Sequence, residues 1–439
     1  MSMAPPVERP SVAIIGGGIA GLTAALGLQD SCRTVLFEAR GQLGGHILPH
    51  PVTDPRGRPA AVDTAFVVFV PETYPRFTAL LQHLGVTHAA AVTKFRITDE
   101  LRELSFPAGE LLQQCGRTLP KECRRELLRL YQLLVRVRRE GLGFIDDLPM
   151  AAWVEQQGLR PETIELGVLP WVASFWGLQP ETVLTVSAKV ALREIARNAG
   201  PYPMHRVVPS TQGYLDALVA ALRHCEHRHQ RVEAVRLRGG PTVHGPRGAE
   251  RFDRVIVAVD AIDARTMLVD AEPRVGEVLG RFGYEPTVAV LHRDPSYLPA
   301  DRSQWCTFHH RRRRDADRVR SVTTWVLDLL HEWHADPTEI ATPTLLATGD
   351  PGLVDEARID PEQVIAVFRH RHLVSTPRVV ASLPELPALD EGQAFTLAGS
   401  YLALGGLHED ALASGARAAD KVRTELGLGP ASWPWSAEG

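Results

Sequence analysis

With 439 residues, 44% of them hydrophobic, the chain is long enough for two or three domains with large cores. The formal net charge of −4 and the mixture of both signs argue against nucleic acid or an acidic membrane surface as the main partner. Five cysteines stand far apart without a CxxC spacing, so a disulfide framework is not expected and the predicted location is cytoplasmic.

The first predicted element is a short apolar strand over residues 11–15, followed by a glycine-rich turn and a helix. The turn carries Gly16, Gly18 and Gly21 in the spacing GxGxxG, and a second strand ends at the acidic residue Glu38. In a dinucleotide-binding unit these glycines allow the tight turn, admit the pyrophosphate and let helix and strand pack closely. The helix N-terminus then faces the phosphates, and the acid accepts hydrogen bonds from ribose hydroxyls. This segment therefore predicts a site for FAD.

An alternative interpretation of residues 11–28 is a signal peptide or a membrane span, because most of these residues are apolar. Five glycines in this window, no basic segment in residues 1–10 and no A-x-A cleavage pattern argue against it. We expect a buried strand and helix instead.

The next part of the chain changes from strand-like to mostly helical. Residues 61–70 are predicted as a strand and residues 74–84 as a helix that ends before Gly85. Helical signals then dominate residues 98–198, and we interpret this region as a helical insertion into the nucleotide-binding framework. Its clearest helical segments are 119–140, 148–157 and 186–198.

Strand and helix signals alternate again after residue 203. A helix is predicted over residues 215–224, and two strands over residues 231–237 and 254–261 would extend the first sheet. Residues 284–330 alternate in the way that antiparallel strands do. A second domain with a sheet and helices is therefore expected.

The last predicted elements are a strand over residues 395–401, a glycine turn and a helix that begins at residues 409–411 and ends near residue 426. The N-terminus of this helix would direct its positive end at N1 and O2 of an isoalloxazine ring. His408 and Glu409 are therefore candidates for catalysis or for direct contact with the cofactor. The alternative is that Glu409 and Asp410 only cap the helix.

Several different short motifs are distributed along nearly the whole chain. They are Leu43-Gly44-Gly45-His46, Val62-Asp63-Thr64-Ala65-Phe66, Thr73-Tyr74-Pro75, Leu84-Gly85-Val86, Ala289-Val290-Leu291-His292 with Asp294, and Leu407-His408-Glu409-Asp410 with Ser414-Gly415. Together with the glycine fingerprint they resemble the flavin amine oxidase and phytoene desaturase superfamily, and most closely a bacterial subgroup of NAD/FAD-binding oxidoreductases. The sequence departs from that subgroup at Ala65, at Val70, at Val326 and Leu327 after the matching Trp325, and at Ala411, which implies a shifted substrate.

The resemblance implies an α/β fold, in which a Rossmann-like FAD-binding domain of the glutathione-reductase type is interleaved with an α+β substrate domain. The first domain would comprise residues 1–97, 205–280 and 388–439, and the second residues 98–204 and 281–387. The residues expected to bind FAD are Gly16, Gly18, Ile19, Ala20, Gly21, Glu38, Ala39, Arg40, Gly44, Gly45, His46, Val232, Gly399, Ser400, His408, Glu409, Asp410 and Ala411. By analogy, His46 replaces an arginine usual in amine oxidases, and Val232 lends backbone groups to the adenine edge. No cysteine follows Cys306, so FAD is expected to be non-covalent.

The resemblance does not determine the reaction, because the superfamily includes amine oxidases, desaturases and isomerases. No GxGxxG preceded by a strand follows residue 45, so no separate nicotinamide domain is expected. The leading hypothesis is an oxidase, dehydrogenase or desaturase that moves a hydride to flavin N5 from a fairly apolar small molecule or an acyl substrate, free or carrier-bound. Alternatives are a flavin-dependent isomerase without net redox change, an amine oxidase, a single-domain hydroxylase, and a scaffold that only sequesters a ligand.

Six aromatic residues could line an apolar substrate pocket, and we expect about two of them to reach the substrate. They are Trp171, Phe175, Trp176, Tyr202, Trp305 and Trp325. For Asp63, a structural hydrogen bond to a neighbouring turn is at least as well supported as a role near the flavin.

Two clusters are predicted to hold no site, and no metal is expected. The histidine-rich residues 224–229 are placed at the polar end of a helix and lack a fourth zinc ligand. The basic residues 309–314 are predicted as a solvated loop, with attraction of an acidic substrate or carrier protein as the alternative.

Overall fold

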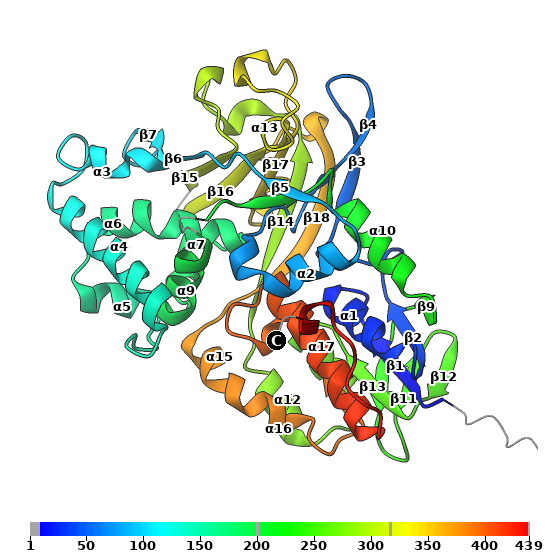
Figure 1. Cartoon of the computed structure of the whole chain (residues 1–439). Helices are drawn as coiled ribbons and strands as arrows, with labels where there is room; N and C mark the ends of the chain where they lie inside the picture. The colour runs from blue at the N-terminus through cyan, green and yellow to red at the C-terminus, as the bar shows by residue number, and fades with distance from the viewer. Residues whose placement is uncertain (1–8, 199–201, 316–317, 438–439) are drawn as a thin grey trace, which may run out of the picture.

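The computed structural model describes residues 9–198, 202–315 and 318–437, and two main sheets organise this part of the chain (Figure 1). The expected absence of a basic segment in residues 1–10 concerns a stretch of which residues 1–8 lie outside the described range. The first sheet is parallel throughout, with the strand order β19-β13-β1-β2-β9. Its strands are β1 (Ser11–Ile15), β2 (Arg33–Glu38), β9 (Cys225–His229), β13 (Arg254–Val257) and β19 (Phe395–Leu397).

Both faces of the parallel sheet are covered, as the apolar sequence of its strands requires. Val12 and Ile14 of β1 face the helices α1 (Ile19–Leu28) and α17 (His408–Glu425), while Ala13 and Ile15 face the opposite core. Figure 1 shows the red helix α17 beside the blue helix α1, so segments from the two ends of the chain pack together. The opposite face is covered by a small antiparallel sheet and short helices. These are β10 (Ala234–Arg236), β11 (Thr242–Gly245), β12 (Gly248–Arg251), α11 (Ala261–Met267), α12 (Pro273–Leu279), α15 (Pro377–Ser382) and α16 (Leu386–Leu389).

The second main sheet has seven strands in the order β18-β14-β17-β16-β15-β6-β7. Its pairs are antiparallel except for β15 with β6, which are parallel. The strands are β6 (Phe95–Asp99), β7 (Leu104–Pro107), β14 (Tyr284–His292), β15 (Phe308–Asp315), β16 (Arg318–Val326), β17 (Leu345–Gly349) and β18 (Val364–Leu373).

A helical layer with its own apolar core lies at one side of the seven-stranded sheet (Figure 1). It contains α3 (Leu111–Gln114), α4 (Glu122–Glu140), α5 (Met150–Gln157), α6 (Pro161–Gly167), α7 (Leu169–Trp176), α8 (Pro180–Val183) and α9 (Ala188–Asn198). The remaining elements connect the layers. They are β3 (Pro49–Thr53), β4 (Pro59–Asp63), α2 (Pro75–His83), β5 (His88–Ala90), β8 (His205–Val207), α10 (Thr211–Ala221), α13 (Leu327–Leu330) and α14 (Gly352–Asp355).

The predicted fold class is confirmed, because a parallel Rossmann-like sheet is interleaved along the chain with a second unit of sheet and helices. The exact domain boundaries stay a prediction. No helix in the described part of the chain has the length and apolar character needed to cross a membrane.

Several predicted elements were wrong in detail. Residues 225–229 are not the polar end of a helix, since α10 stops at Ala221 and these residues pair with β2 as strand β9. Residues 231–237 do not extend the parallel sheet, because β10 pairs with the following hairpin in a separate sheet. In residues 61–70 only the first three are strand, as the end of β4.

The insertion after residue 98 is not purely helical, because residues 95–107 contribute β6 and β7 to the seven-stranded sheet. The basic residues 309–314 are not a solvated loop but lie in β15, where His309, His310 and Arg312 are buried. Arg312 is paired there with the carboxylates of Asp99 and Glu165.

Candidate functional site

A cavity of about 1080 Å³ lies between the two main sheets. One wall is formed by the loops that follow the carboxyl ends of β1, β2, β13 and β19, which is where open parallel sheets bind ligands. The other wall comes from β14, β15, β16, β18 and the helix α7. Small-molecule sites commonly enclose about 300–1,000 Å³, so this cavity has room for a large ligand.

The glycine turn between β1 and α1 leaves open space at one position and none at the others. Gly16 has a φ of +107°, a conformation that L side chains rarely adopt. A Cβ on Gly21 would lie 1.9 Å from the Gly16 carbonyl oxygen, so Gly21 is needed for the turn and does not line the cavity. A Cβ on Gly18, by contrast, would meet nothing closer than the Gly45 Cα at 3.8 Å, and Gly18 lines the cavity. This is the open approach that a pyrophosphate needs at the N-terminus of α1.

Glu38 stands at the end of β2 with its carboxylate already oriented. One oxygen accepts a hydrogen bond from the Gly17 backbone N–H at 2.7 Å, and the other accepts one from Arg40 N–H at 2.8 Å. A carboxylate has about four acceptor positions, so two remain for hydroxyl groups in the cavity. Glu38 is 9% exposed and lines the cavity, as a ribose-binding acid should.

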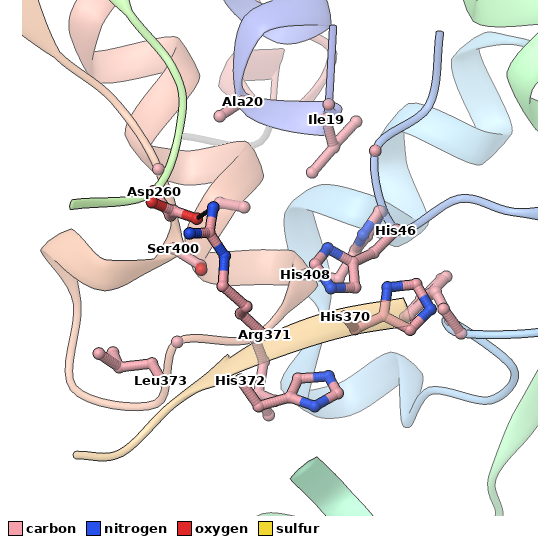
Figure 2. A pocket seen from close by; sticks show the side chains of 18 of the residues that line it. Ile19, Ala20, His46, Asp260, His370, Arg371, His372, Leu373, Ser400 and His408 are labelled. Carbon is pink, nitrogen blue, oxygen red and sulfur yellow. Dashed lines mark hydrogen bonds and ion pairs between the residues drawn. The ribbon is translucent and has the colours of Figure 1, made fainter. Parts of the chain in front are cut away.

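The diglycine turn brings His46 into the same space. His46 is exposed and lines the cavity, with its ring stacked on that of His370 at 4.9 Å between ring centroids (Figure 2). Desolvation by the surrounding protein atoms, and then the positive charge of Arg40, lower the pKa of His46 to about 4. His46 is therefore a neutral hydrogen-bonding group at pH 7.

The predicted cofactor-binding residues converge on this cavity. Those that line it are Gly16, Gly18, Ile19, Ala20, Glu38, Ala39, Arg40, Gly44, Gly45, His46, Val232, Gly399, Ser400, His408 and Ala411. Gly21, Glu409 and Asp410 do not line it. A role in binding stays a prediction for each of them.

His408 lies at the start of α17, one position earlier than the helix was predicted to begin. Its ring stacks on Phe66 at 4.0 Å between centroids, and its Nε2 is 3.4 Å from the Tyr214 hydroxyl. Burial lowers the pKa of His408 to about 3. At pH 7 His408 is therefore a neutral imidazole held among aromatic rings in the cavity wall, and catalysis or cofactor contact by it stays a prediction.

The two acids that follow His408 have structural partners. Glu409 accepts hydrogen bonds from the backbone N–H groups of Arg76 at 3.0 Å and Phe77 at 2.9 Å, at the start of α2. Asp410 accepts one from Leu407 N–H at 3.1 Å and caps its own helix. Asp410 therefore caps the last helix, as the alternative interpretation expects of both acids. Glu409 instead caps the neighbouring helix α2. A catalytic role for Glu409 has no support in this geometry, because its carboxylate does not reach the cavity.

Asp63 also has a structural partner. It is 2% exposed and accepts hydrogen bonds from the Thr211 backbone N–H at 2.9 Å and the Thr211 hydroxyl at 2.5 Å. Burial, opposed by these bonds, raises the pKa of Asp63 to about 7. Of the two interpretations of this residue, the hydrogen bond to a neighbouring turn is the one observed.

The part of the cavity against the seven-stranded sheet is aromatic. Five of the six predicted aromatic residues line it, while Trp305 is buried elsewhere and donates its Nε1–H to Pro299 O at 2.8 Å. How many of the five reach the substrate stays a prediction. The five are Trp171, Phe175, Trp176, Tyr202 and Trp325, and the sequence analysis missed Phe66, Phe69, Phe95 and Phe308. Phe95 and Phe308 are neighbours across β6 and β15, a pairing that single-chain patterns do not reveal.

Strand β18 supplies five more lining residues that the sequence analysis missed, Leu373 and the alternating sequence Arg369-His370-Arg371-His372. Successive side chains of a strand point to opposite faces, so the arginines and the histidines diverge. Figure 2 shows Arg371 reaching toward Asp260, to which it is bound at 2.6 Å, while His370 and His372 lie beside His46. The alternation predicts that the two histidines share one face of a strand, but not that this face borders a cavity.

Charged lining residues avoid the aromatic part of the cavity. Those on the side of the parallel sheet are Glu38, Arg40, Arg231, Glu233, Asp260 and Asp263. Arg369 and Arg371 are bound to carboxylates outside the aromatic part, Asp355 for the first and Asp260 and Asp263 for the second. Within the described residues, no group of three or more His, Cys, Asp or Glu side chains has the geometry of a metal site.

The residues present fit FAD. The open space at Gly18, the oriented carboxylate of Glu38 and the N-termini of α1 and α17 all border one cavity. An elongated dinucleotide would be held along the parallel sheet, with its flavin end toward His46, His408 and the aromatic residues. The five cysteines are all unpaired, and none of them lines the cavity, so none is placed to form a cysteinyl link to a flavin there.

Comparison with known proteins supports a dinucleotide-binding domain at the start of the chain. Residues 14–84 match the family model of an NAD(P)-binding Rossmann-like domain. No curated protein sequence matches the chain significantly. Among solved structures, the fold is similar to an Exiguobacterium protein provisionally named a protoporphyrinogen oxidase, at 16% identity and a TM-score of 0.68, with 95% of this chain and 99% of the other covered.

Two further structures show the range of reactions found on this fold. Cyclohexylamine oxidase from Brevibacterium oxydans has 16% identity and a TM-score of 0.65, with 95% of this chain and 100% of the other covered. A fatty acid isomerase from P. acnes, which produces CLA, has 14% identity and a TM-score of 0.68, with coverage of 97% and 100%. The chain therefore carries a dinucleotide-binding Rossmann-like domain within a fold that it shares with these three proteins.

Proposed function

We propose that the protein is an FAD-dependent oxidoreductase that dehydrogenates a fairly apolar small molecule or acyl chain. The observation that carries this proposal is the single cavity that joins the glycine fingerprint to an uncharged aromatic pocket. The short motifs at residues 43–46 and 407–410 further support membership of the bacterial subgroup of NAD/FAD-binding oxidoreductases. The unpaired cysteines agree with the proposed cytoplasmic location.

FAD, when bound, supplies the acceptor for a hydride from a substrate C–H bond. The chain contributes binding and orientation. The amides at the N-terminus of α1 and the carboxylate of Glu38 hold the nucleotide, and the aromatic rings orient the substrate and exclude water. Neutral His370 and His372 offer hydrogen bonds to one polar group of the substrate without placing a charge there.

The lining of the aromatic part favours an uncharged substrate over a cationic amine. No carboxylate among the described lining residues comes from the seven-stranded sheet or α7, so an ammonium group would lack a counter-charge there. An acyl chain, free or bound to a carrier, places its apolar part against these rings at no such cost.

The first test is the visible spectrum of the purified protein, with the cofactor released by heat and identified. The holoprotein is then titrated without oxygen against unsaturated fatty acyl compounds, with primary amines as the comparison set. Bleaching of the flavin by an acyl compound with an oxidised product is the expected result. Bleaching by amines alone, or an isomerised product with no acceptor consumed, would replace dehydrogenation of an apolar substrate with one of the alternatives. A colourless protein that takes up no FAD would remove the proposal altogether.

A further inference from the structure

The helix α4 exposes apolar side chains that the core of the protein does not use. Its buried face contributes Leu130 and Val137 to the apolar core of the helical layer. On its other side, Leu128 is 44% exposed, Tyr131 63% and Val135 39%. Residues three and four apart are neighbours on a helix surface, so these three side chains form one line along the helix. We call Leu128, Tyr131 and Val135 the α4 stripe.

Exposed apolar side chains are concentrated in this region of the described chain. Ten large hydrophobic residues are exposed among the described residues, and four of them lie on α3 and α4, because Leu112 of α3 is exposed as well. The helix α4 packs on α6 and α9 at the outer end of the helical layer (Figure 1). A local group of exposed apolar residues with a polar rim is typical of an interaction surface.

The rim of the α4 stripe is positively charged. Arg124 and Arg125 lie one helical turn before Leu128, and Arg129 follows it directly. All three arginines are exposed, and no carboxylate of the described residues lies within ion-pair distance of them. Their charges are therefore available to a partner.

The carboxylates of α4 do not neutralise these arginines. The helix contains six arginines and three glutamates, and each glutamate has another partner. Glu122 and Glu126 pair with Arg160, and Glu140 pairs with Arg136 and Arg139. The net charge of the whole chain, −4, averages over both signs and therefore gave no sign of this basic surface.

The chemistry of this surface selects among possible partners. A second copy of the chain on the same face would bring Arg124, Arg125 and Arg129 of both copies together, because a two-fold interface pairs a surface with itself. A line of apolar side chains with a basic rim instead matches the surface of an anionic bilayer. The apolar side chains enter the headgroup region there, and the long arginine side chains reach the phosphates from the edge of the stripe.

We propose that the α4 stripe and its three arginines dock the protein on a membrane surface that contains anionic phospholipid. The helix lies in the plane of that surface, while its opposite face stays packed in the helical layer. This docking does not depend on the proposed function, but a membrane is also a store of acyl chains of the class proposed as substrate.

The test measures flotation of the full-length protein with lipid vesicles at low and at high salt. One set of vesicles consists of phosphatidylcholine alone, and the other of equal parts of phosphatidylcholine and phosphatidylglycerol. Two surface variants remove the apolar and the basic part of the surface. They are Leu128→Ser with Tyr131→Ser, and Arg124→Gln with Arg125→Gln and Arg129→Gln.

Each surface variant has a matched control with the same change at exposed positions outside the helical layer. These controls are Ile262→Ser with Val269→Ser, and Arg236→Gln with Arg238→Gln and Arg247→Gln. The second control loses the same net charge as the arginine variant, so it separates a local effect from that of total charge. Thermal unfolding verifies that each variant is folded.

We expect the parent protein to float with the anionic vesicles, to bind phosphatidylcholine vesicles far more weakly, and to be released from the anionic vesicles by high salt. Both surface variants should lower the affinity for anionic vesicles at least about tenfold, because each basic residue near such a surface contributes roughly a factor of five. The two controls should match the parent.

Two results would overturn the proposal. One is a parent protein that does not float with the anionic vesicles, and the other is equal flotation of the surface variants and their controls. If the parent ignores vesicles but is retained by an immobilised acidic acyl carrier protein, and the arginine variant is not, the surface belongs to a protein partner instead. None of these readouts uses turnover, so a failure of the proposed function would leave them unchanged.

Discussion

Gly18 is the residue whose side chain, if it had one, would occupy the space reserved for the cofactor. Because a Cβ there meets nothing closer than 3.8 Å, we expect Gly18→Val to fold normally but to purify without FAD. The matched control is Gly41→Val, at an exposed position where a Cβ meets nothing within 4 Å and which does not line the cavity. Absorbance at visible wavelengths and thermal unfolding measure the two effects. A fully yellow Gly18→Val protein would show that the pyrophosphate does not bind here.

Asp63 gives the protein a stability that depends on pH. Its pKa is about 7 in the folded protein against a model-compound value of 3.8, so the folded state prefers the protonated carboxyl. The stabilising contribution of this group is complete below about pH 4 and is lost as the pH rises to about 7. One pKa unit corresponds to about 1.4 kcal/mol, so the loss is at most about 4 kcal/mol.

We therefore expect Asp63→Asn to gain free energy of unfolding relative to the parent as the pH rises from 4 to 7. Denaturant unfolding at several pH values measures this gain. Asp216→Asn, on the exposed side of the nearby helix α10, is the control and should show no such trend. A constant difference between Asp63→Asn and the parent across this range would contradict the prediction.

Single residues also show where sequence analysis succeeds. The positions of Gly16, Gly18 and Glu38 follow from local chemistry, because a tight turn and a ribose-binding acid need those residue types at that spacing. His370 and His372 were missed, since nothing local distinguishes a histidine facing a cavity from one facing a core. Their position depends on β18 pairing with β14, a contact between distant segments.

At the scale of elements, Glu409 joins two helices. Its carboxylate accepts from two backbone N–H groups of α2 that have no partner within their own helix. Glutamine has one carbonyl oxygen, so Glu409→Gln should lose one of these bonds and lower the free energy of unfolding by about 1–3 kcal/mol. Denaturant unfolding and the flavin spectrum measure the change.

A structural role for Glu409 predicts that turnover per bound FAD stays near the parent value in Glu409→Gln. A large loss of turnover with unchanged stability would restore the catalytic role that its place in the sequence suggested. Asp420→Asn, in the same helix α17, is a control for a half-buried carboxylate bond remote from the cavity, since Asp420 accepts from Trp433 Nε1 at 2.9 Å.

Elements with strong local signals were predicted well, and those defined by partners were not. The helices α5 and α9 begin two residues after their predicted starts at 148 and 186, because helical spacing is a local property. The residues of strand β9 were predicted as the end of a helix, because their polar sequence gives no strand signal. They form a strand only through their pairing with β2. The basic strand β15 was taken for a loop for the same reason, as Asp99 and Glu165, which neutralise Arg312, come from other elements.

For the whole molecule, FAD should act as a stabilising ligand. A ligand that binds only the folded state stabilises it by about 2.7 kcal/mol when its concentration is 100 times Kd. We expect removal of FAD to lower Tm and its return to restore it. FMN lacks the adenosine that Glu38 is oriented to hold, so FMN should restore Tm less completely. Equal recovery with FMN would show that the adenosine half of the site is not used.

The order of the strands in the parallel sheet also sets when this protein can acquire its cofactor during synthesis. The middle strand β1 is made first, while its neighbours β13 and β19 come from residues 254–257 and 395–397. The helix α17, which packs on α1 and borders the cavity, follows only after that. Translation must therefore reach nearly the end of the chain before all the residues that border the FAD site have been synthesised. Until then the glycine turn of residues 16–21 lies exposed on the nascent chain. Premature termination anywhere before residue 395 should yield polypeptides that quality-control proteases remove as apoprotein.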